Sequence, residues 1–165
     1  MNCTTPAAKF YPLPKLQLLL AAEREAGRRI ALANGCFDLI HIGHVRYLQE
    51  ARSIADILVV ALNSDASLRR LKGEQRGIFR ESERIALISS LDCVDYVTLF
   101  EQETVTEVLL TLKPDFHCKG SDYTPQTVPE REVVASYGGS IKIVGGAKVR
   151  STSDILKSIL SLPKK

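Results

Sequence analysis

The sequence predicts an α/β fold, a doubly wound, Rossmann-like parallel sheet of five strands with helices on both faces. Short apolar runs alternate along the chain with segments that have the periodicity of amphipathic helices. The run at 57–62, ILVVAL, is apolar throughout, which is typical of a strand covered on both faces. Strands alternating with helices at this interval build right-handed crossover units and hence one parallel sheet.

In the first half of the chain, two helices and two strands precede a polar stretch. Leucines at helical spacing predict a helix over 13–27, which Gly27 ends. The short apolar segment 30–34 predicts a buried strand, and 43–55 has the spacing of an amphipathic helix before the strand 57–62. The polar stretch that follows is expected to be a loop.

The second half repeats the alternation. Helices are expected at 81–91, 103–112 and 129–136, and strands at 94–100, 115–118 and 140–144. Lys113-Pro114 ends the second of these helices, because proline disfavours a helical conformation in the residue before it. A last helix is expected to start at Ser151 to Ser153, since serine and threonine favour helix N-termini.

Length and composition predict one domain over 1–165, with residues 1–12 as an extended tail. The four cysteines form no CxxC pair, which favours a reducing compartment and a cytoplasmic location. The apolar run 16–22 is too short to span a membrane.

The net charge is only +3, and it is concentrated between Arg69 and Arg84. This small excess, together with 6% aromatic residues and no tryptophan, argues against a nucleic-acid-binding surface. Arg69 and Arg70 are interpreted as solvated surface charges.

The segment 34–44 is expected to follow a strand and open a helix. Doubly wound sheets bind ligands at the carboxyl ends of their strands, and a helix N-terminus favours anions. His41 and His44 can point into one space there, and Gly43 lets a phosphate approach the backbone. The two imidazoles could stabilise a phosphoryl oxygen, could be plain polar surface, or could bind zinc with Cys36. The dinucleotide motif GxGxxG is absent from this segment, and the P-loop motif from the whole chain.

Residues 41–44 read HIGH, and five segments extend the pattern: NGCFDLIHIGHVRYLQEAR, VVALNSDASLRRLKG, ERIALISSLDCVDYV, KPDFHCKGSDY and RSTSDIL. Over about residues 15–160 they resemble the heptose 1-phosphate adenylyltransferases of the HxGH nucleotidyltransferase superfamily, in their stand-alone form. The resemblance implies that ATP and heptose 1-phosphate give ADP-heptose, a surface-polysaccharide precursor, and pyrophosphate. It also implies Mg²⁺ with the ATP, no other metal site, and a homodimer.

The resemblance, together with the chemistry of the side chains, assigns roles to individual residues. The expected catalytic residues are His41, His44 and Lys72. The expected nucleotide-binding residues are Gly35, Cys36, Phe37, Gly43, Lys119, Gly120, Arg150, Ser151, Thr152 and Ser153. The expected substrate-binding residues are Asn34, Asp38, Asn63, Asp65, Arg76, Arg84, Asp122 and Tyr123.

Other interpretations stay open at this point. Asp122 could simply stabilise a turn, and Ser151 to Ser153 could cap a helix without a ligand. Gly77 stands where the family has proline, and Ser121 where it has a second glycine. The acceptor could be another phosphate, such as glycerol 3-phosphate, ethanolamine phosphate or flavin mononucleotide, with CTP or ATP as donor. A nucleotide sensor or a zinc-stabilised module is the non-enzymatic alternative.

Overall fold

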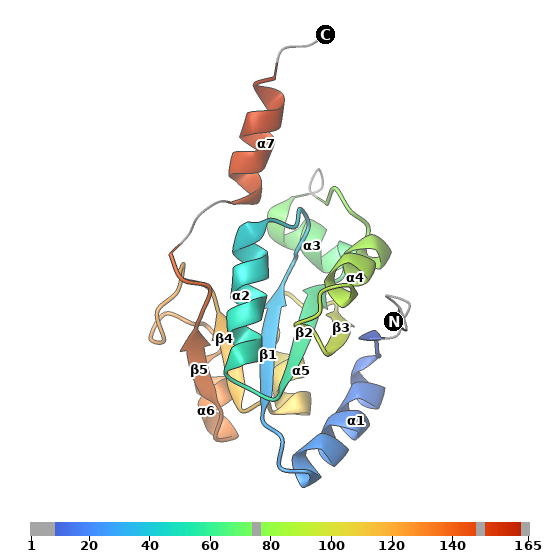
Figure 1. The fold of residues 1–165 in the computed structure, drawn as a ribbon, viewed down its shortest axis with the longest axis vertical. Helices are drawn as coiled ribbons and strands as arrows, with labels where there is room; N and C mark the ends of the chain where they lie inside the picture. The colour runs from blue at the N-terminus through green and yellow to red at the C-terminus, as the bar shows by residue number, and fades with distance from the viewer. Residues whose placement is uncertain (1–8, 74–76, 148–150, 163–165) are drawn as a thin grey trace.

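The computed structural model describes residues 9–73, 77–147 and 151–162, and its centre is one parallel five-stranded sheet (Figure 1). The strands are β1 (Ile30–Gly35), β2 (Ile57–Asn63), β3 (Tyr96–Phe100), β4 (Phe116–Lys119) and β5 (Ser140–Ile143). Their order is β3-β2-β1-β4-β5 and every pairing is parallel. The predicted fold class is therefore confirmed.

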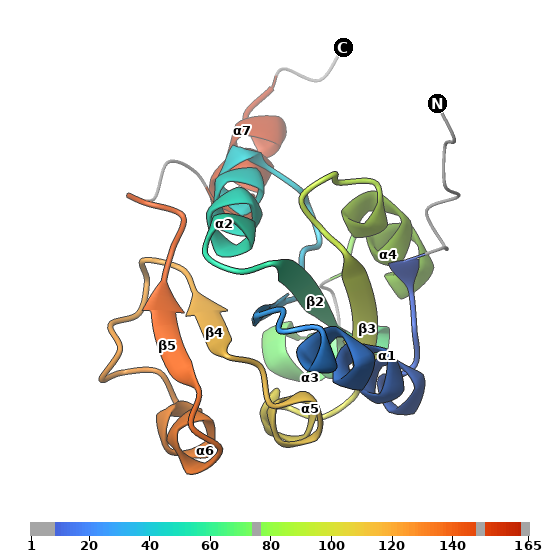
Figure 2. The same cartoon turned by 60° about the horizontal axis from the view of Figure 1, so that its bottom comes forward.

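Helices cover both faces of this sheet (Figure 2). The helices are α1 (Leu13–Glu25), α2 (Ile42–Ser53), α3 (Asp65–Lys72), α4 (Glu81–Ser89), α5 (Thr106–Leu112), α6 (Arg131–Ser136) and α7 (Thr152–Leu160). Side chains of α2 and α4 pack on one face of the sheet, and those of α1, α5 and α6 pack on the other. None of the described helices is long and apolar enough to cross a membrane.

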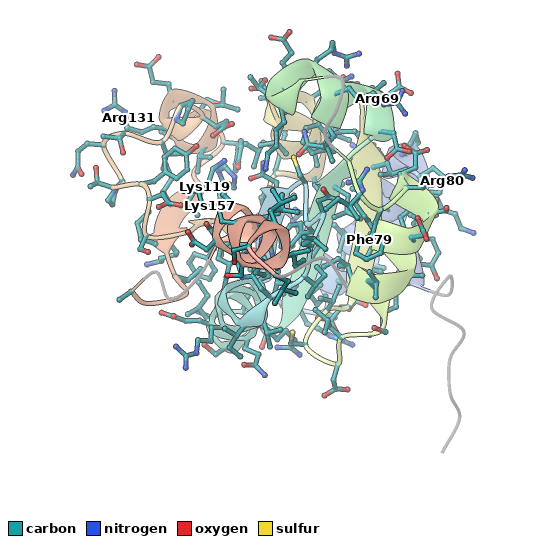
Figure 3. All side chains as sticks on the ribbon, turned by 90° about the horizontal axis from the view of Figure 1, so that it is seen from above. Arg69, Phe79, Arg80, Lys119, Arg131 and Lys157 are labelled. Atoms are coloured by element: carbon teal, nitrogen blue, oxygen red, sulfur yellow. The ribbon has the colours of Figure 1, made fainter. Side chains whose placement is uncertain are left out.

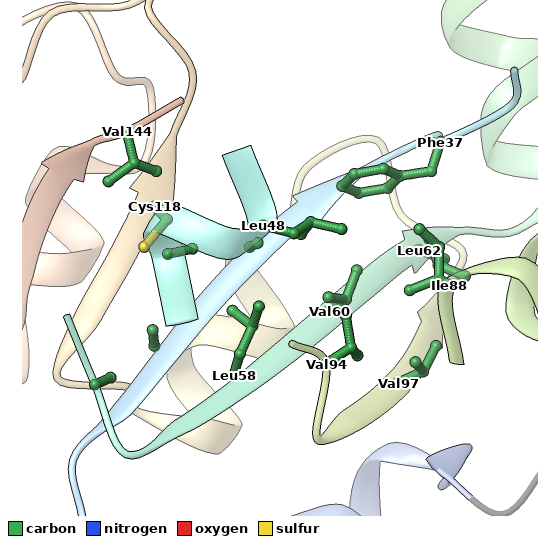
Figure 4. Packing of buried hydrophobic residues seen from close by; sticks show 14 residues of the cluster. Phe37, Leu48, Leu58, Val60, Leu62, Ile88, Val94, Val97, Cys118 and Val144 are labelled. Atoms are coloured by element: carbon green, nitrogen blue, oxygen red, sulfur yellow. The ribbon is translucent and has the colours of Figure 1, made fainter. Parts of the chain in front are cut away.

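Alternation along the strands builds one core on each face. Ala31 and Ala33 of β1 lie in the core under α2 and α4, whereas Ile30 and Leu32 lie in the opposite core. Every residue of β2 is buried, because this strand is covered on both faces, as its uninterrupted apolar run predicts. Figure 4 shows the first core, in which Leu48 of α2 packs over the sheet.

The predicted elements are present, with ends that differ by a few residues. The expected loop after β2 is wrong, because residues 65–72 form α3. The hydroxyl of Ser64 accepts a hydrogen bond from the N–H of Ser67 and so caps this helix. Of the expected tail, residues 9–12 lie against the edge strand β3, where the N–H of Tyr11 donates to the carbonyl of Val97, and residues 1–8 lie outside the described part.

The strand order reverses between β1 and β4, because the chain adds β2 and β3 on one side of β1 before crossing to the other side. The carboxyl ends of β1 and β4 therefore meet at the switch point of the sheet. The last helix, α7, stands above this edge and projects beyond the body of the molecule (Figure 1).

Candidate active site

A cavity of about 490 Å³ opens at the switch point, between the loops that follow β1, β4 and β5. Figure 3 looks down on this edge, with α7 seen end-on, Lys119 on the β4 side and Arg80 on the α4 side. Most of the residues expected to form the site line this cavity. They are Asn34, Gly35, Cys36, Phe37, Asp38, His41, Gly43, His44, Asn63, Lys72, Lys119, Gly120, Asp122, Tyr123, Ser151, Thr152 and Ser153.

The two histidines are stacked at the opening of α2, with ring centroids 3.8 Å apart. His41 is the N-cap of the helix, and its Nδ1 accepts a hydrogen bond from the N–H of Gly43 at 3.1 Å. Neutral His41 therefore carries its proton on Nε2. Burial lowers the pKa of His44 to about 4, and the neighbouring His41 and Lys72 contribute to the same shift. His44 is thus a neutral imidazole at physiological pH.

Phe37 anchors the loop that carries the histidines. Its ring is buried against His44 and Tyr47, in the core under α2. Its backbone has φ = +46°, a conformation that few residues other than glycine adopt. A side chain on Gly35 would approach that ring to 3.1 Å, so this glycine gives the ring its space. The anchored ring fixes where His41 and His44 stand.

The opening of α7 forms the far wall of the cavity. The hydroxyl of Ser151 accepts from the N–H of Asp154, whose carboxylate accepts from the N–H of Ser151 in return. This is a capping box. Capping and anion binding both use a helix N-terminus, so the interpretation of Ser151 as a cap is supported, and its expected nucleotide contact stays a prediction.

Polar side chains from the first two strand ends line the cavity and also hydrogen-bond to other segments of the chain. The carboxylate of Asp38 accepts hydrogen bonds from the N–H groups of Ile78 and Phe79, at 2.9 to 3.0 Å. The amide of Asn63 donates to Ser67 in α3. Lys72, at the end of α3, is exposed and supplies a cation.

Two residues expected to bind substrate lie elsewhere. Arg84 is fully buried, and its guanidinium donates to the carbonyls of Cys36 and Asn63 at 2.8 and 2.7 Å and to the carboxylate of Asp65 at 2.8 Å. Neither Arg84 nor Asp65 lines the cavity. The pair ties the ends of β1 and β2 together, and the expected contact of either residue with substrate stays a prediction. Arg76 and Arg150 lie outside the described residues.

The structure adds residues that the sequence did not assign to the site. Tyr47 lines the cavity and donates its hydroxyl proton to the carbonyl of Cys118 at 2.7 Å. Residues 144–147 line it from the end of β5, together with Ser121. The glycine pair at 145–146 could have indicated this part of the site, because it lies between an expected strand and an expected helix start.

Among the residues that the structure describes, the side chains do not gather into a set of ligands for a metal ion. Across 9–73, 77–147 and 151–162, no three His, Cys, Asp or Glu side chains form a cluster that could hold a metal ion. Asp38 and Asp65 are engaged with backbone N–H groups and with Arg84, respectively. Zinc binding by Cys36, His41 and His44 therefore has no support in this arrangement.

Comparisons with known proteins show the family of the chain. The cytidylyltransferase-like family model matches residues 32–154. The bifunctional protein HldE of Pelobacter propionicus is 50% identical over 145 residues, and that of Geobacter sulfurreducens 49% over 153 residues. These matches cover 88% and 93% of this chain but only 30% and 31% of the relatives, so the chain spans under a third of their length.

A solved structure is also similar. The lipopolysaccharide core biosynthesis protein from Thermoplasma volcanium superposes with a TM-score of 0.59 at 33% identity, over 71% of this chain and 94% of the other. The chain belongs to the cytidylyltransferase-like family, and the resemblance found in its motifs is confirmed.

The buried tie can be tested through stability. We expect Arg84→Lys to lower the free energy of unfolding by about 2–4 kcal/mol, because an ammonium cannot serve three acceptors held in a guanidinium's geometry. Arg69→Lys, an exposed change in α3, should shift it by less than about 0.5 kcal/mol. Urea unfolding measures both. Unchanged stability with weakened substrate binding would restore the substrate role of Arg84.

The stability of the fold should depend on pH through the buried His117. His117 of β4 is fully buried, and burial followed by the charge of Lys119 lowers its pKa to about 3. Between about pH 6 and 4 the unfolded chain takes up a proton there that the folded chain does not, so stability falls as pH falls. This group adds a slope approaching about 1.4 kcal/mol per pH unit. His117→Gln should have a shallower slope in urea unfolding between pH 4.5 and 7, and equal slopes would contradict the assignment.

Proposed function

We propose that this chain transfers AMP from ATP to heptose 1-phosphate, which gives ADP-heptose and pyrophosphate. The observation that carries the proposal is the pair of stacked imidazoles at a helix N-terminus, in a cavity that also receives two lysines and the start of α7. Such a cavity suits a nucleotide polyphosphate. The similarity to the HldE proteins and to a lipopolysaccharide core biosynthesis protein supports a sugar phosphate as acceptor.

The acceptor is itself the nucleophile. A sugar phosphate has a second pKa of about 6, so it is a dianion at neutral pH and needs no general base. One of its oxygens attacks the α-phosphorus of ATP, a new P–O bond forms, and the bond to the β-phosphate oxygen breaks as pyrophosphate leaves. Catalysis then consists of in-line placement and of stabilising the charge that develops.

The histidines are suited to that second task. Neutral His41 presents an Nε2–H donor, because Gly43 occupies its Nδ1. Burial keeps His44 neutral, so the stacked rings do not repel one another as two cations. We assign both rings to the α-phosphate, where a preorganised donor strengthens as charge builds. Lys72 and the opening of α7 serve the departing pyrophosphate.

The remaining cavity residues divide between the two substrates. Residues 145–147 and Tyr47 line the same cavity as the opening of α7. They are assigned to the nucleoside, together with Gly35, Cys36, Phe37, Gly43 and Gly120. Asn34, Asn63, Asp122 and Tyr123 are assigned to the sugar phosphate, since amides, carboxylates and hydroxyls suit sugar hydroxyls. Asp38, which lines the cavity while its carboxylate accepts from the N–H groups of Ile78 and Phe79, is assigned to the same substrate.

Magnesium belongs to the nucleotide in this proposal. Mg²⁺ keeps most of its waters and is commonly held through substrate phosphates, which agrees with a cavity that offers no carboxylate cluster among the described residues. Mg·ATP is then the substrate, and the chain contributes Lys72 and backbone N–H groups beside it.

The expected cytoplasmic location and homodimer belong to the same proposal. Location is supported by the thiols of Cys36, Cys93 and Cys118, which are free cysteines in the part of the chain that the structure describes. The dimer stays a prediction drawn from the family resemblance.

The direct test measures pyrophosphate release with Mg²⁺, each nucleoside triphosphate and a panel of acceptors. The panel holds heptose 1-phosphate, glycerol 3-phosphate, ethanolamine phosphate and flavin mononucleotide. We expect turnover with ATP and heptose 1-phosphate and formation of ADP-heptose. A preference for CTP or for another acceptor would overturn the assigned substrates, and binding without turnover on any pair would favour a nucleotide sensor.

The role of His44 is tested by His44→Ala. We expect kcat to fall a hundredfold or more, as for loss of a transition-state donor, while the melting temperature stays near that of the wild type. Gln49→Ala, an exposed change in the same helix, should retain full activity. Wild-type kcat in the His44 variant would remove this residue from the mechanism.

A further inference from the structure

Two buried residues with no assigned role lie beside one wall of the cavity. Glu130, just before α6, is 6% exposed, and His117 of β4 is fully buried. Neither lines the cavity, but both lie next to residues that do. The carboxylate of Glu130 is 3.3 Å from the ammonium of Lys119, and His117 Nε2 is 3.1 Å from Asn34 Oδ1.

These contacts fix the direction of the Lys119 ammonium. One of its three protons goes to Asn34 Oδ1 at 3.1 Å, and Glu130 Oε2 forms an ion pair with the ammonium at 3.3 Å. Lys119 lines the cavity, and its ammonium lies 5.4 Å from the ring centre of Tyr123 on the cavity wall. Even if Glu130 takes a second proton, the ammonium keeps one for the cavity side.

The contacts also fix how Asn34 is presented. Its side-chain oxygen receives Lys119 and His117 together, so Nε2 of His117 carries the proton of that neutral ring. The amide NH₂ of Asn34 therefore donates to neither Lys119 nor His117. Two donors, the Asn34 amide of β1 and the Lys119 ammonium of β4, are thus held side by side at the switch point.

The charge of Lys119 depends on Glu130. Lys119 is 9% exposed, and burial lowers the pKa of its ammonium, whereas the carboxylate of Glu130 raises it. The other groups near the ammonium are the neutral His117 on its own strand, Asn34 on β1 and Tyr123 in the following loop. Tyr47 on α2 and Asp122 in that loop line the same cavity. Glu130 is the buried group of opposite charge in direct contact.

We propose that Glu130 is a positioning residue, which holds Lys119 as a cation and aims one of its N–H groups into the cavity at the nucleotide phosphates. The inference deepens the proposed function and rests on it for the identity of the nucleotide. A merely structural ion pair would affect stability alone. A positioning role predicts that nucleotide binding becomes sensitive to pH when the carboxylate is neutralised.

The test measures Mg·ATP binding by calorimetry at pH 7.5 and 9. The dissociation constant of the wild type should change less than threefold between these pH values. Glu130→Gln should bind Mg·ATP at least tenfold more weakly at pH 9 than at pH 7.5, because its buried Lys119 loses the proton. Glu132→Gln, an exposed neighbour on α6, is the matched control and should behave as wild type. A Glu130→Gln profile parallel to that of wild type would overturn the proposal.

Two further variants separate position from folding. Lys119→Met should bind Mg·ATP weakly at both pH values. Adding Glu130→Gln to it should weaken binding by no more than a further twofold, since the two residues act as a unit. If Glu130→Gln does not fold, Glu130→Asp, which keeps the charge on a shorter arm, replaces it. Affinity of Glu130→Asp within twofold of wild type would then overturn the proposal.

A ligand-free measurement keeps this inference distinct from the proposed function. The titration of ¹³C-labelled Lys119 followed by NMR should move to lower pH by a unit or more in Glu130→Gln, and an unchanged titration would refute the role of Glu130. If wild type binds no ATP, the proposed function fails, and this titration still decides whether Glu130 holds the charge.

Discussion

The guanidinium of Arg84 joins the two strand ends on which the site is built. It donates to the carbonyls of Cys36 and Asn63, which follow β1 and end β2, and to the carboxylate of Asp65 at the start of α3. Neighbouring parallel strands hydrogen-bond along their length, but their diverging loops do not. The buried guanidinium donates to those carbonyls, so they do not need water as a hydrogen-bond partner. The loop to His41 and the helix that ends at Lys72 both start from this junction.

Around that junction, the groups that face the cavity are held by one another before any substrate arrives. His41 is fixed by Gly43, Asp38 by the loop N–H groups, and Asn34 by Lys119 and His117. Burial keeps the imidazoles of His44 and His117 neutral, while Glu130 opposes the loss of charge on Lys119. The cavity therefore combines neutral donors with two cations. That combination suits a reaction in which charge moves between phosphates and no proton has to be removed.

The sequence predicted the sheet well because its strands are apolar and buried, and it predicted the His pair because HIGH is a local pattern at a helix start. It missed α3 because most residues of this helix are polar or charged, which is also typical of a loop, although Ser64 caps it. The buried tie made by Arg84 was not predicted, because two of its acceptors are backbone carbonyls 21 and 48 residues away, which a side-chain pattern does not indicate. Glu130 escaped notice for a similar reason: its partner Lys119 lies on another element.

In the proposed reaction, ATP places its α-phosphate between the stacked histidines and the opening of α7. A crystal structure with Mg²⁺ and a non-hydrolysable ATP analogue would show this placement. We expect α-phosphate oxygens within hydrogen-bonding distance of His41 and His44, with the terminal phosphates at Lys72 and the N–H groups of α7. A nucleotide bound away from the two imidazoles, or with its phosphates turned from α7, would rule this placement out.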